Sequence, residues 1–246
     1  MRDWTGKRYW LIGASEGLGR ALAEEMSRAG AELILSARSG ERLQALADSL
    51  PGKAEVVTID VGDRASVEAA AKAAGEIDGM VFLAGVYWPM PSQQVDAAQL
   101  EQMCDINFTG AARCLGAVLP KMVARERGHI VLTGSLSGFR GLPGAVGYGA
   151  SKAGVMSLAE TLYADLRKTG VDVQLVNPGF IRTRLTDKNE FSMPFIMDPE
   201  PAAKIFFDHM NTRRFARNFP RAFSLVFRLS QFLPDWAYYR LFGAAA

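Results

Sequence analysis

The amino-acid sequence predicts an α/β fold in which a doubly wound parallel sheet carries helices on both faces. Short apolar runs alternate with helix-length amphipathic segments from residue 9 to residue 179. The runs are continuous in Val, Ile and Leu, which is typical of parallel strands that are buried on both faces. A glycine-rich turn joins the first apolar run to the first helical segment, as in nucleotide-binding sheets of this class.

The alternation defines the expected elements in chain order. The apolar runs predict strands at residues 9–13, 31–37, 54–61, 77–85, 129–135 and 171–179. The segments between them predict helices at residues 18–30, 39–50, 63–75, 107–128 and 148–170. A chain of 246 residues suffices for one large α/β domain, and no linker separates two. We expect this domain to span residues 1–200, with a C-terminal helical extension, residues 201–246, packed on it.

The overall composition is that of an ordinary globular protein. Hydrophobic residues make up 49% of the chain, charged residues 22%, and the formal net charge is +2. A charge so close to zero gives no general electrostatic reason to expect nucleic acid as a partner. No stretch reaches the roughly 20 apolar residues of a membrane-spanning helix. The N-terminal stretch lacks the long apolar core of a signal peptide, so we expect a cytoplasmic protein.

The cysteines and histidines form no metal-binding pattern. Cys104 and Cys114 stand ten residues apart, which gives neither a CxxC motif nor a disulfide framework and is consistent with a reducing compartment. His129 and His209 have no partner at metal-ligand spacing, and we interpret both as structural or surface residues. We therefore expect no catalytic metal.

Two hydroxyls and an amine form a candidate catalytic set. Tyr148 and Lys152 stand four residues apart in YGASK, and Ser135 lies thirteen residues upstream in GSLSG. On a helix, this spacing puts the phenol and the ammonium on one face. Because a nearby cation favours phenolate, we expect Lys152 to lower the pKa of Tyr148 from its usual value of about 10. The alternative is a Tyr/Lys pair on an ordinary solvated helix.

The turn after the first strand, GASEGLG, places glycines at positions 13, 17 and 19. A tight turn, a close backbone approach to a pyrophosphate and close packing of helix on strand all require glycine, and the helix N-terminus favours an anion. The spacing is GxxxGxG instead of GxGxxG, and alone it would indicate a plain glycine turn. At the first strand-to-helix turn of an alternating chain, it predicts a Rossmann-like dinucleotide site.

The end of the second strand indicates which dinucleotide is preferred. Proteins specific for NAD usually have an acidic residue here, whereas this chain has Ala37 and Arg38. A guanidinium forms charge-assisted hydrogen bonds with a 2′-phosphate, so we expect NADP(H) to be preferred, with NAD(H) as the alternative. The opposing observations are that Arg38 could be a solvated surface residue and that Glu16 adds a negative charge. Asp60 ends the third strand, where it would accept from the adenine amino group or cap a helix.

Further motifs give the chain a resemblance to a known family. Five separated motifs occur in the order found in the short-chain dehydrogenase/reductase family. They are the glycine turn, Asn107 in NFTG, Ser135, YGASK and the stretch NPGFIRT from residue 177. The chain resembles the compact single-domain type of this family from about residue 6 to residue 185. The resemblance implies a catalytic tetrad of Asn107, Ser135, Tyr148 and Lys152. With Arg38, the expected cofactor contacts are Gly13, Ser15, Gly17, Leu18, Gly19, Asp60, Val61, Ala84, Gly85, Tyr148, Lys152, Pro178, Gly179, Ile181 and Thr183.

The chain departs from the family pattern at two places. The family usually has threonine where Ile12 stands, and an Asn-Asn-Ala-Gly stretch where this chain has Phe82, Leu83, Ala84 and Gly85. The loss of both asparagines changes the local support of the adenosine pocket and the central sheet. The reaction centre implied by the resemblance is complete.

The implied reaction transfers a hydride between nicotinamide and a carbonyl/alcohol pair. In reduction, Ser135 would donate a hydrogen bond to the carbonyl oxygen while Tyr148 delivers the proton. Lys152 would stabilise tyrosinate and hold the nicotinamide ribose hydroxyls. Asn107 would anchor a water that links Lys152 to solvent; its alternative role is to bond the backbone at a helix bend.

The segment of residues 184–200 follows the nicotinamide-binding motif, where the family has a mobile substrate cover. It is markedly apolar, and Trp88 could add a second wall, so an apolar substrate is expected. The alternative is that these side chains pack the cover onto the body. The apolar residues are Phe191, Met193, Phe195, Ile196 and Met197.

The C-terminal extension is basic and aromatic. From Pro201 onward, seven Lys and Arg residues face two Asp residues, a net charge of +5, so the rest of the chain carries −3. Interleaved Phe, Leu, Trp and Tyr give a pattern typical of helices on anionic membrane surfaces. The alternative is a helix that caps the domain or completes a subunit interface.

These features together predict an NADP(H)-dependent oxidoreductase acting on a small-molecule carbonyl/alcohol pair with an apolar substrate. The alternative from another class is a catalytically silent dinucleotide-binding sensor or scaffold, and the intact Ser135, Tyr148 and Lys152 set argues against it. Because family members commonly associate through the helix that carries YGASK, we expect a homodimer or homotetramer. Peripheral contact with the inner face of a membrane, through the basic aromatic tail, is a further expectation.

Overall fold

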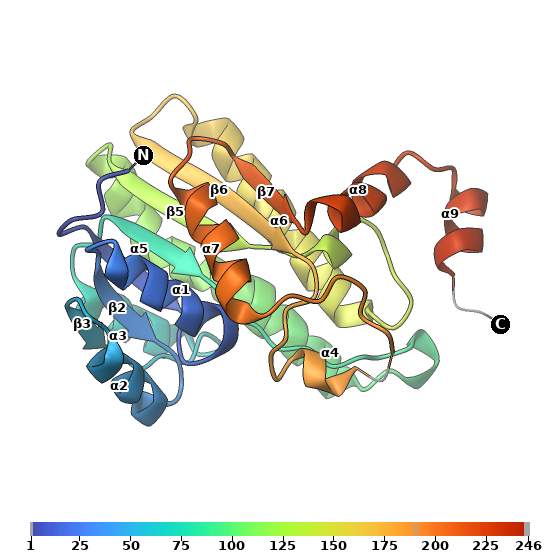
Figure 1. The fold of residues 1–246 in the computed structure, drawn as a ribbon, viewed down its shortest axis with the longest axis horizontal. Helices are drawn as coiled ribbons and strands as arrows, with labels where there is room; N and C mark the ends of the chain where they lie inside the picture. The colour runs from blue at the N-terminus through green and yellow to red at the C-terminus, as the bar shows by residue number, and fades with distance from the viewer. Residues whose placement is uncertain (1, 190, 244–246) are drawn as a thin grey trace.

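A computed structural model describes residues 2–189 and 191–243, and a seven-stranded parallel sheet forms its centre (Figure 1). The strands follow the order β3-β2-β1-β4-β5-β6-β7, so the chain winds outward in both directions from β1. The predicted doubly wound fold is therefore confirmed. The strands are β1 (Arg8–Ile12), β2 (Glu32–Ser36), β3 (Ala54–Val56), β4 (Gly79–Phe82), β5 (Gly128–Thr133), β6 (Val171–Pro178) and β7 (Ala216–Phe219).

Two helical layers cover the sheet. One layer contains α1 (Gly17–Arg28), α2 (Gly40–Ser49) and α7 (Pro199–Met210), with α1 and α7 side by side (Figure 1). The other contains α3 (Arg64–Ala74), α5 (Gly110–Ala124) and α6 (Val146–Leu166). Each layer closes its own apolar core against the sheet, because side chains alternate between the two faces of every strand. Leu11 faces the first core and its neighbours Trp10 and Ile12 face the second.

The predicted boundaries hold within a few residues except around the fourth helix. The structure begins that region with α4 (Ala97–Cys104), continues through a π-helical turn at Asp105–Thr109 and only then enters α5. The predicted third and fourth strands are also shortened, because their last residues leave the sheet to line a cavity.

The C-terminal extension contains the predicted helices and one unpredicted strand. Its helices are α7, α8 (Arg221–Ser230) and α9 (Asp235–Phe242), whereas β7 pairs with β6 at the sheet edge. The four residues of β7 include Arg217 and Asn218 and form no apolar run, so periodicity gives no signal for it. Ala244–Ala246 of the predicted extension lie outside the described residues.

A buried polar chain ties three elements together near the start of β1 and β5. The Tyr9 hydroxyl lies 2.9 Å from His129 Nδ1, and His129 Nε2 lies 2.8 Å from Gln174 Oε1. Since the amide oxygen of Gln174 only accepts, His129 donates from Nε2 and accepts from Tyr9 at Nδ1, as a neutral ring. Burial lowers the pKa of His129 to about 3. This histidine is structural, as its sequence position suggests.

We expect this histidine to make the fold acid-sensitive. Between about pH 6.5 and pH 3, the unfolded chain binds a proton that folded His129 excludes, so the free energy of unfolding decreases as the pH falls through this window. Urea titrations of the wild type and His129→Gln at pH 7.5 and pH 4.5 measure the effect. The variant should start less stable but lose less stability between the two pH values. Equal losses in the two proteins would contradict the assignment.

Candidate active site

A cavity of about 750 Å³ lies where the carboxyl ends of β1, β2, β4, β5 and β6 meet. Ligands bind at this edge of open α/β sheets, at the point where the strand order reverses. Every residue predicted to contact the cofactor lines this cavity, and so do Ser135, Tyr148 and Lys152. Asn107 is the predicted site residue that does not line it, because its side chain is buried directly behind.

The glycine turn is built by close backbone contacts. A Cβ on Gly19 would stand 2.0 Å from the carbonyl oxygen of Gly13, and a Cβ on Gly13 would stand 2.5 Å from the amide nitrogen of Ala84. Gly13 also has a φ of +96°, which side chains rarely adopt. The turn therefore brings β1, the N-terminus of α1 and the end of β4 into direct contact, and leaves α1 with free amide groups toward the cavity.

The two departures from the family pattern are neighbours in the sheet. Ile12 on β1 pairs in register with Phe82 on β4, and both side chains are fully buried in the same apolar core. An apolar pair thus occupies the positions where polar residues are usual. The central sheet is supported here by packing, and the cavity edge at Gly13 and Ala84 keeps its geometry.

Positive charge gathers where β2 ends. Arg38, Ser39 and Arg42 line the cavity, and Glu16 lies opposite them in the glycine turn. Arg42 Nη1 lies 3.3 Å from the Glu16 carboxylate, which also pairs with Arg184. The negative charge of Glu16, which the sequence suggests is unfavourable, is therefore balanced by two guanidinium groups.

The helix cap near Asp60 is provided by another residue. Asp63 accepts from the amides of Ala65 and Ser66 at the start of α3, as an N-cap does. Asp60 instead accepts from Gly62 N at 2.9 Å and lines the cavity. The alternative interpretation of Asp60 as a helix cap is wrong.

Tyr148 and Lys152 lie one turn apart near the start of α6, and Ser135 lies two residues after the end of β5. Lys152 is buried, and its Nζ donates to the carbonyl oxygen of Thr133 at 2.9 Å. The ammonium lies 5.8 Å from the centroid of the Tyr148 ring. Burial lowers the pKa of Lys152 to about 8.

The sequence predicted that the pKa of Tyr148 is lowered, and for this arrangement that prediction is wrong. Burial raises the pKa of Tyr148 to about 12, and the opposing effect of the Ser135 side chain is smaller. Lys152 directs its ammonium to a backbone carbonyl, and removal of the phenol from water dominates. The phenol is therefore protonated at neutral pH, the state that a proton donor requires.

Hydrogen bonds behind the site hold it in place. The Ser135 hydroxyl oxygen accepts from the amide of Ser137 at 3.2 Å and lies 3.0 Å from its hydroxyl. Asn107, in the π-helical turn, accepts from Val86 N at 2.7 Å and donates to Val86 O and Ser151 Oγ, each at 3.0 Å. These are the contacts of an asparagine that bonds backbone at a helix bend. Its role toward a water stays a prediction.

Aromatic side chains form the far wall of the cavity. Phe191 comes from the apolar segment named in the sequence analysis, but Met193, Phe195, Ile196 and Met197 do not line the cavity. Trp88 does not line the cavity either. Lys188 Nζ lies over its ring, 4.3 Å from the ring centroid. Sequence reasoning missed the other aromatic lining residues, which come from three separate segments: Tyr87, Phe180, Phe223 and Phe227.

A model of the short chain dehydrogenase family matches residues 7–192, about three quarters of the chain. The chain belongs to the short-chain dehydrogenase family. The resemblance inferred from the motifs is therefore confirmed. As a member of this family, the protein is an oxidoreductase that acts on CH–OH or carbonyl groups with a nicotinamide dinucleotide.

Individual relatives extend the similarity over the C-terminal part. An uncharacterized oxidoreductase of Myxococcus xanthus is 38% identical over 253 residues, covering 100% of this chain and 98% of the relative. A short chain dehydrogenase/reductase of Burkholderia phymatum in complex with NAD has a TM-score of 0.86 at 28% identity, covering 94% of each chain. A short-chain dehydrogenase of Sphingobium yanoikuyae in complex with NADPH has a TM-score of 0.82 at 28% identity, covering 98% and 96%.

We expect Gly19→Ala to weaken both dinucleotide binding and the fold. Its Cβ would overlap the carbonyl of Gly13, and overpacking of this kind costs about 1–3 kcal/mol. Gly116→Ala is the matched control, because a Cβ there meets nothing within 4 Å and alanine stabilises a helix interior by about 0.5–1 kcal/mol. Urea unfolding and dinucleotide titration would measure both variants. Unchanged binding by Gly19→Ala would contradict the role of the turn.

Proposed function

We propose that the protein is an NADP(H)-dependent oxidoreductase that reduces an apolar carbonyl compound, or oxidises the corresponding alcohol. The observation that carries this proposal is a single continuous cavity. It reaches from the glycine turn and the arginines beside β2, past Ser135, Tyr148 and Lys152, to the aromatic wall. Binding of a dinucleotide and of an apolar substrate in that order along the cavity follows from this lining.

The arginines support the preference for NADP(H). A 2′-phosphate carries negative charge, and Arg38 and Arg42 border the part of the cavity that follows β2. Glu16 forms ion pairs with Arg42 and Arg184, and these pairs reduce the repulsion between its carboxylate and a phosphate. The residues proposed to hold the rest of the cofactor are those of the glycine turn, Asp60, Lys152 and the segment from Pro178 to Thr183.

The bound cofactor would supply the hydride, and the protein has to manage one proton. In reduction, the Tyr148 hydroxyl transfers its proton to the substrate oxygen while Ser135 donates a hydrogen bond to the same oxygen. The phenolate that remains is stabilised by the Lys152 ammonium and regains a proton from solvent by way of Lys152. Asn107 keeps the neighbouring backbone at Val86 in place and is the proposed anchor for a water on this route.

An apolar substrate is supported by the aromatic wall. Phe180, Phe191, Phe223 and Phe227 line the cavity beyond the catalytic residues, and the rings of Phe180 and Phe223 lie 5.9 Å apart. These side chains offer no hydrogen bond to a polar substrate. Association of the subunits through α6, as a homodimer or homotetramer, and a cytoplasmic location belong to the same proposal.

Replacement of Tyr148 by Phe tests the proton donor. General acids contribute about 10²–10⁴-fold, so kcat on a panel of apolar aldehydes and ketones should fall at least about 100-fold while NADPH binding persists. Tyr163→Phe is the matched control on the same helix, because its ring stacks on Phe215 away from the cavity. Near wild-type turnover by Tyr148→Phe would exclude the proposed acid. A wild-type protein that binds NADPH but oxidises it with no carbonyl compound would favour the sensor alternative.

Replacement of Arg38 by Gln tests the cofactor preference. Hydrogen bonds to charged groups are worth about 1.5–3 kcal/mol, so NADPH affinity should fall about tenfold to a hundredfold while NADH affinity changes little. Calorimetric titration of both cofactors measures this. Arg20→Gln, which removes an arginine paired with Glu24 on α1, serves as the control. An equal loss for both cofactors would contradict recognition of the 2′-phosphate.

A further inference from the structure

The C-terminal extension leaves a large apolar surface uncovered. Twelve large hydrophobic side chains of the described residues are exposed, and seven of them lie between positions 225 and 241. Phe232 is 86% exposed and Trp236 is 74% exposed. Such clustering exceeds the scattered apolar residues of an ordinary surface and indicates an interaction site. We call these seven residues the outer patch: Leu225, Val226, Leu229, Phe232, Trp236, Tyr239 and Leu241.

Helix α8 has two apolar faces. Phe223 and Phe227, one turn apart, face the cavity, and the Phe223 ring lies 5.5 Å from that of Phe195. Leu225 and Leu229, also one turn apart, face outward and are 49% and 64% exposed. The inner face of α8 caps the domain, which is one of the two roles that the sequence analysis considers for the C-terminal extension. The outer face is left without a partner within the described chain.

Arg140 fixes the corner between α8 and α9. Its guanidinium donates to Ser230 O at 3.0 Å and Leu233 O at 2.8 Å, pairs with Asp235 and lies 3.9 Å over the ring of Tyr238. The Tyr238 hydroxyl donates to Gly141 O at 2.8 Å. These polar contacts hold the inner side of α9, so the outer patch faces away from the rest of the domain. Figure 1 shows α8 and α9 projecting from the domain.

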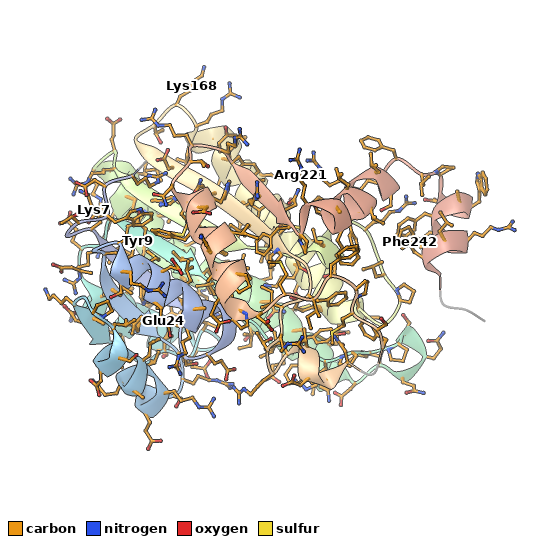
Figure 2. The ribbon with its side chains drawn as sticks, in the orientation of Figure 1. Lys7, Tyr9, Glu24, Lys168, Arg221 and Phe242 are labelled. Atoms are coloured by element: carbon orange, nitrogen blue, oxygen red, sulfur yellow. The ribbon has the colours of Figure 1, made fainter. Side chains whose placement is uncertain are left out.

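The charge around the outer patch is positive. Arg221 and Arg228 stand two turns apart along the flank of the Leu225 and Leu229 stripe, and Figure 2 shows Arg221 where α8 leaves the body. The helices α8 and α9 contain three arginines, Arg221, Arg228 and Arg240, and one acidic residue, Asp235, which pairs with Arg140. The two helices therefore carry a net charge of +2. A second copy seated on the same patch would bring these arginines together, whereas anionic headgroups complement them.

We propose that α8 and α9 dock on the surface of an anionic phospholipid bilayer. The outer patch lies in the boundary between headgroups and acyl chains, and the flanking arginines contact lipid phosphates. Docking is parallel to the surface, since no helix among residues 2–189 and 191–243 is long and apolar enough to cross a bilayer. The proposal concerns this surface alone and does not depend on the proposed reaction.

Flotation of the full-length protein with vesicles tests the docking. One set of vesicles contains phosphatidylcholine with about 30% of the anionic lipid phosphatidylglycerol, and the other contains phosphatidylcholine alone. The wild type should float with the anionic vesicles and be released by high salt. Leu225→Gln with Leu229→Gln and Trp236→Gln should reduce binding at least about tenfold. The double variant Arg221→Gln with Arg228→Gln should reduce binding to the anionic vesicles about fivefold for each arginine. It should leave binding to pure phosphatidylcholine unchanged.

Matched controls separate docking from loss of fold. Val95→Gln with Val123→Gln removes two exposed apolar side chains outside the outer patch and should leave flotation unchanged. All variants should retain the wild-type melting temperature and NADPH affinity. A wild type that stays unbound on anionic vesicles overturns the proposal. It is also overturned if, without lipid, the apolar variant lowers the molecular mass in light scattering, because the patch then joins two copies of this chain.

Discussion

Burial of the Lys152 ammonium against the Thr133 carbonyl is the contact on which the site depends. A buried amine is unfavourable without a partner, and this one is held at 2.9 Å by the end of β5. The bond fixes the start of α6 over the carboxyl edge of the sheet. Tyr148, one turn earlier on α6, and Ser135, two residues after Thr133, are consequently placed in the same cavity. The lowered pKa of Lys152 and the protonated phenol follow from the same removal from water.

Local features of the sequence predicted the doubly wound parallel sheet and the residues that line the cavity around the glycine turn. The glycines at 13, 17 and 19 and the YGASK helix act through contacts close in sequence or through strand ends that a parallel sheet must bring together. Apolar runs likewise revealed six of the seven strands, five of which are almost wholly buried, whereas β3 is half-buried. The seventh, β7, is a short edge strand with arginine and asparagine in it, and its pairing is visible only in the fold.

The aromatic lining of the cavity could not be predicted in the same way. Phe223 and Phe227 lie 40 and 44 residues beyond the NPGFIRT stretch, and only the return of the chain through β7 brings them to the cavity. Trp88 and Tyr87 are adjacent in sequence and point to different places, so the chain alone does not distinguish them. The direction in which the pKa of Tyr148 shifts also depends on a three-dimensional fact, the burial of its phenol, which raises that pKa.

The ion pair between Glu16 and Arg184 joins the two walls of the cavity, one from the glycine turn and the other from the segment after β6. Both side chains are substantially exposed, at 36% and 63%, and ion pairs in such positions contribute about 0–1 kcal/mol. Breaking this ion pair therefore costs little free energy. Dissolved salt screens such a pair, so this link between the glycine turn and the segment after β6 weakens further as the ionic strength rises.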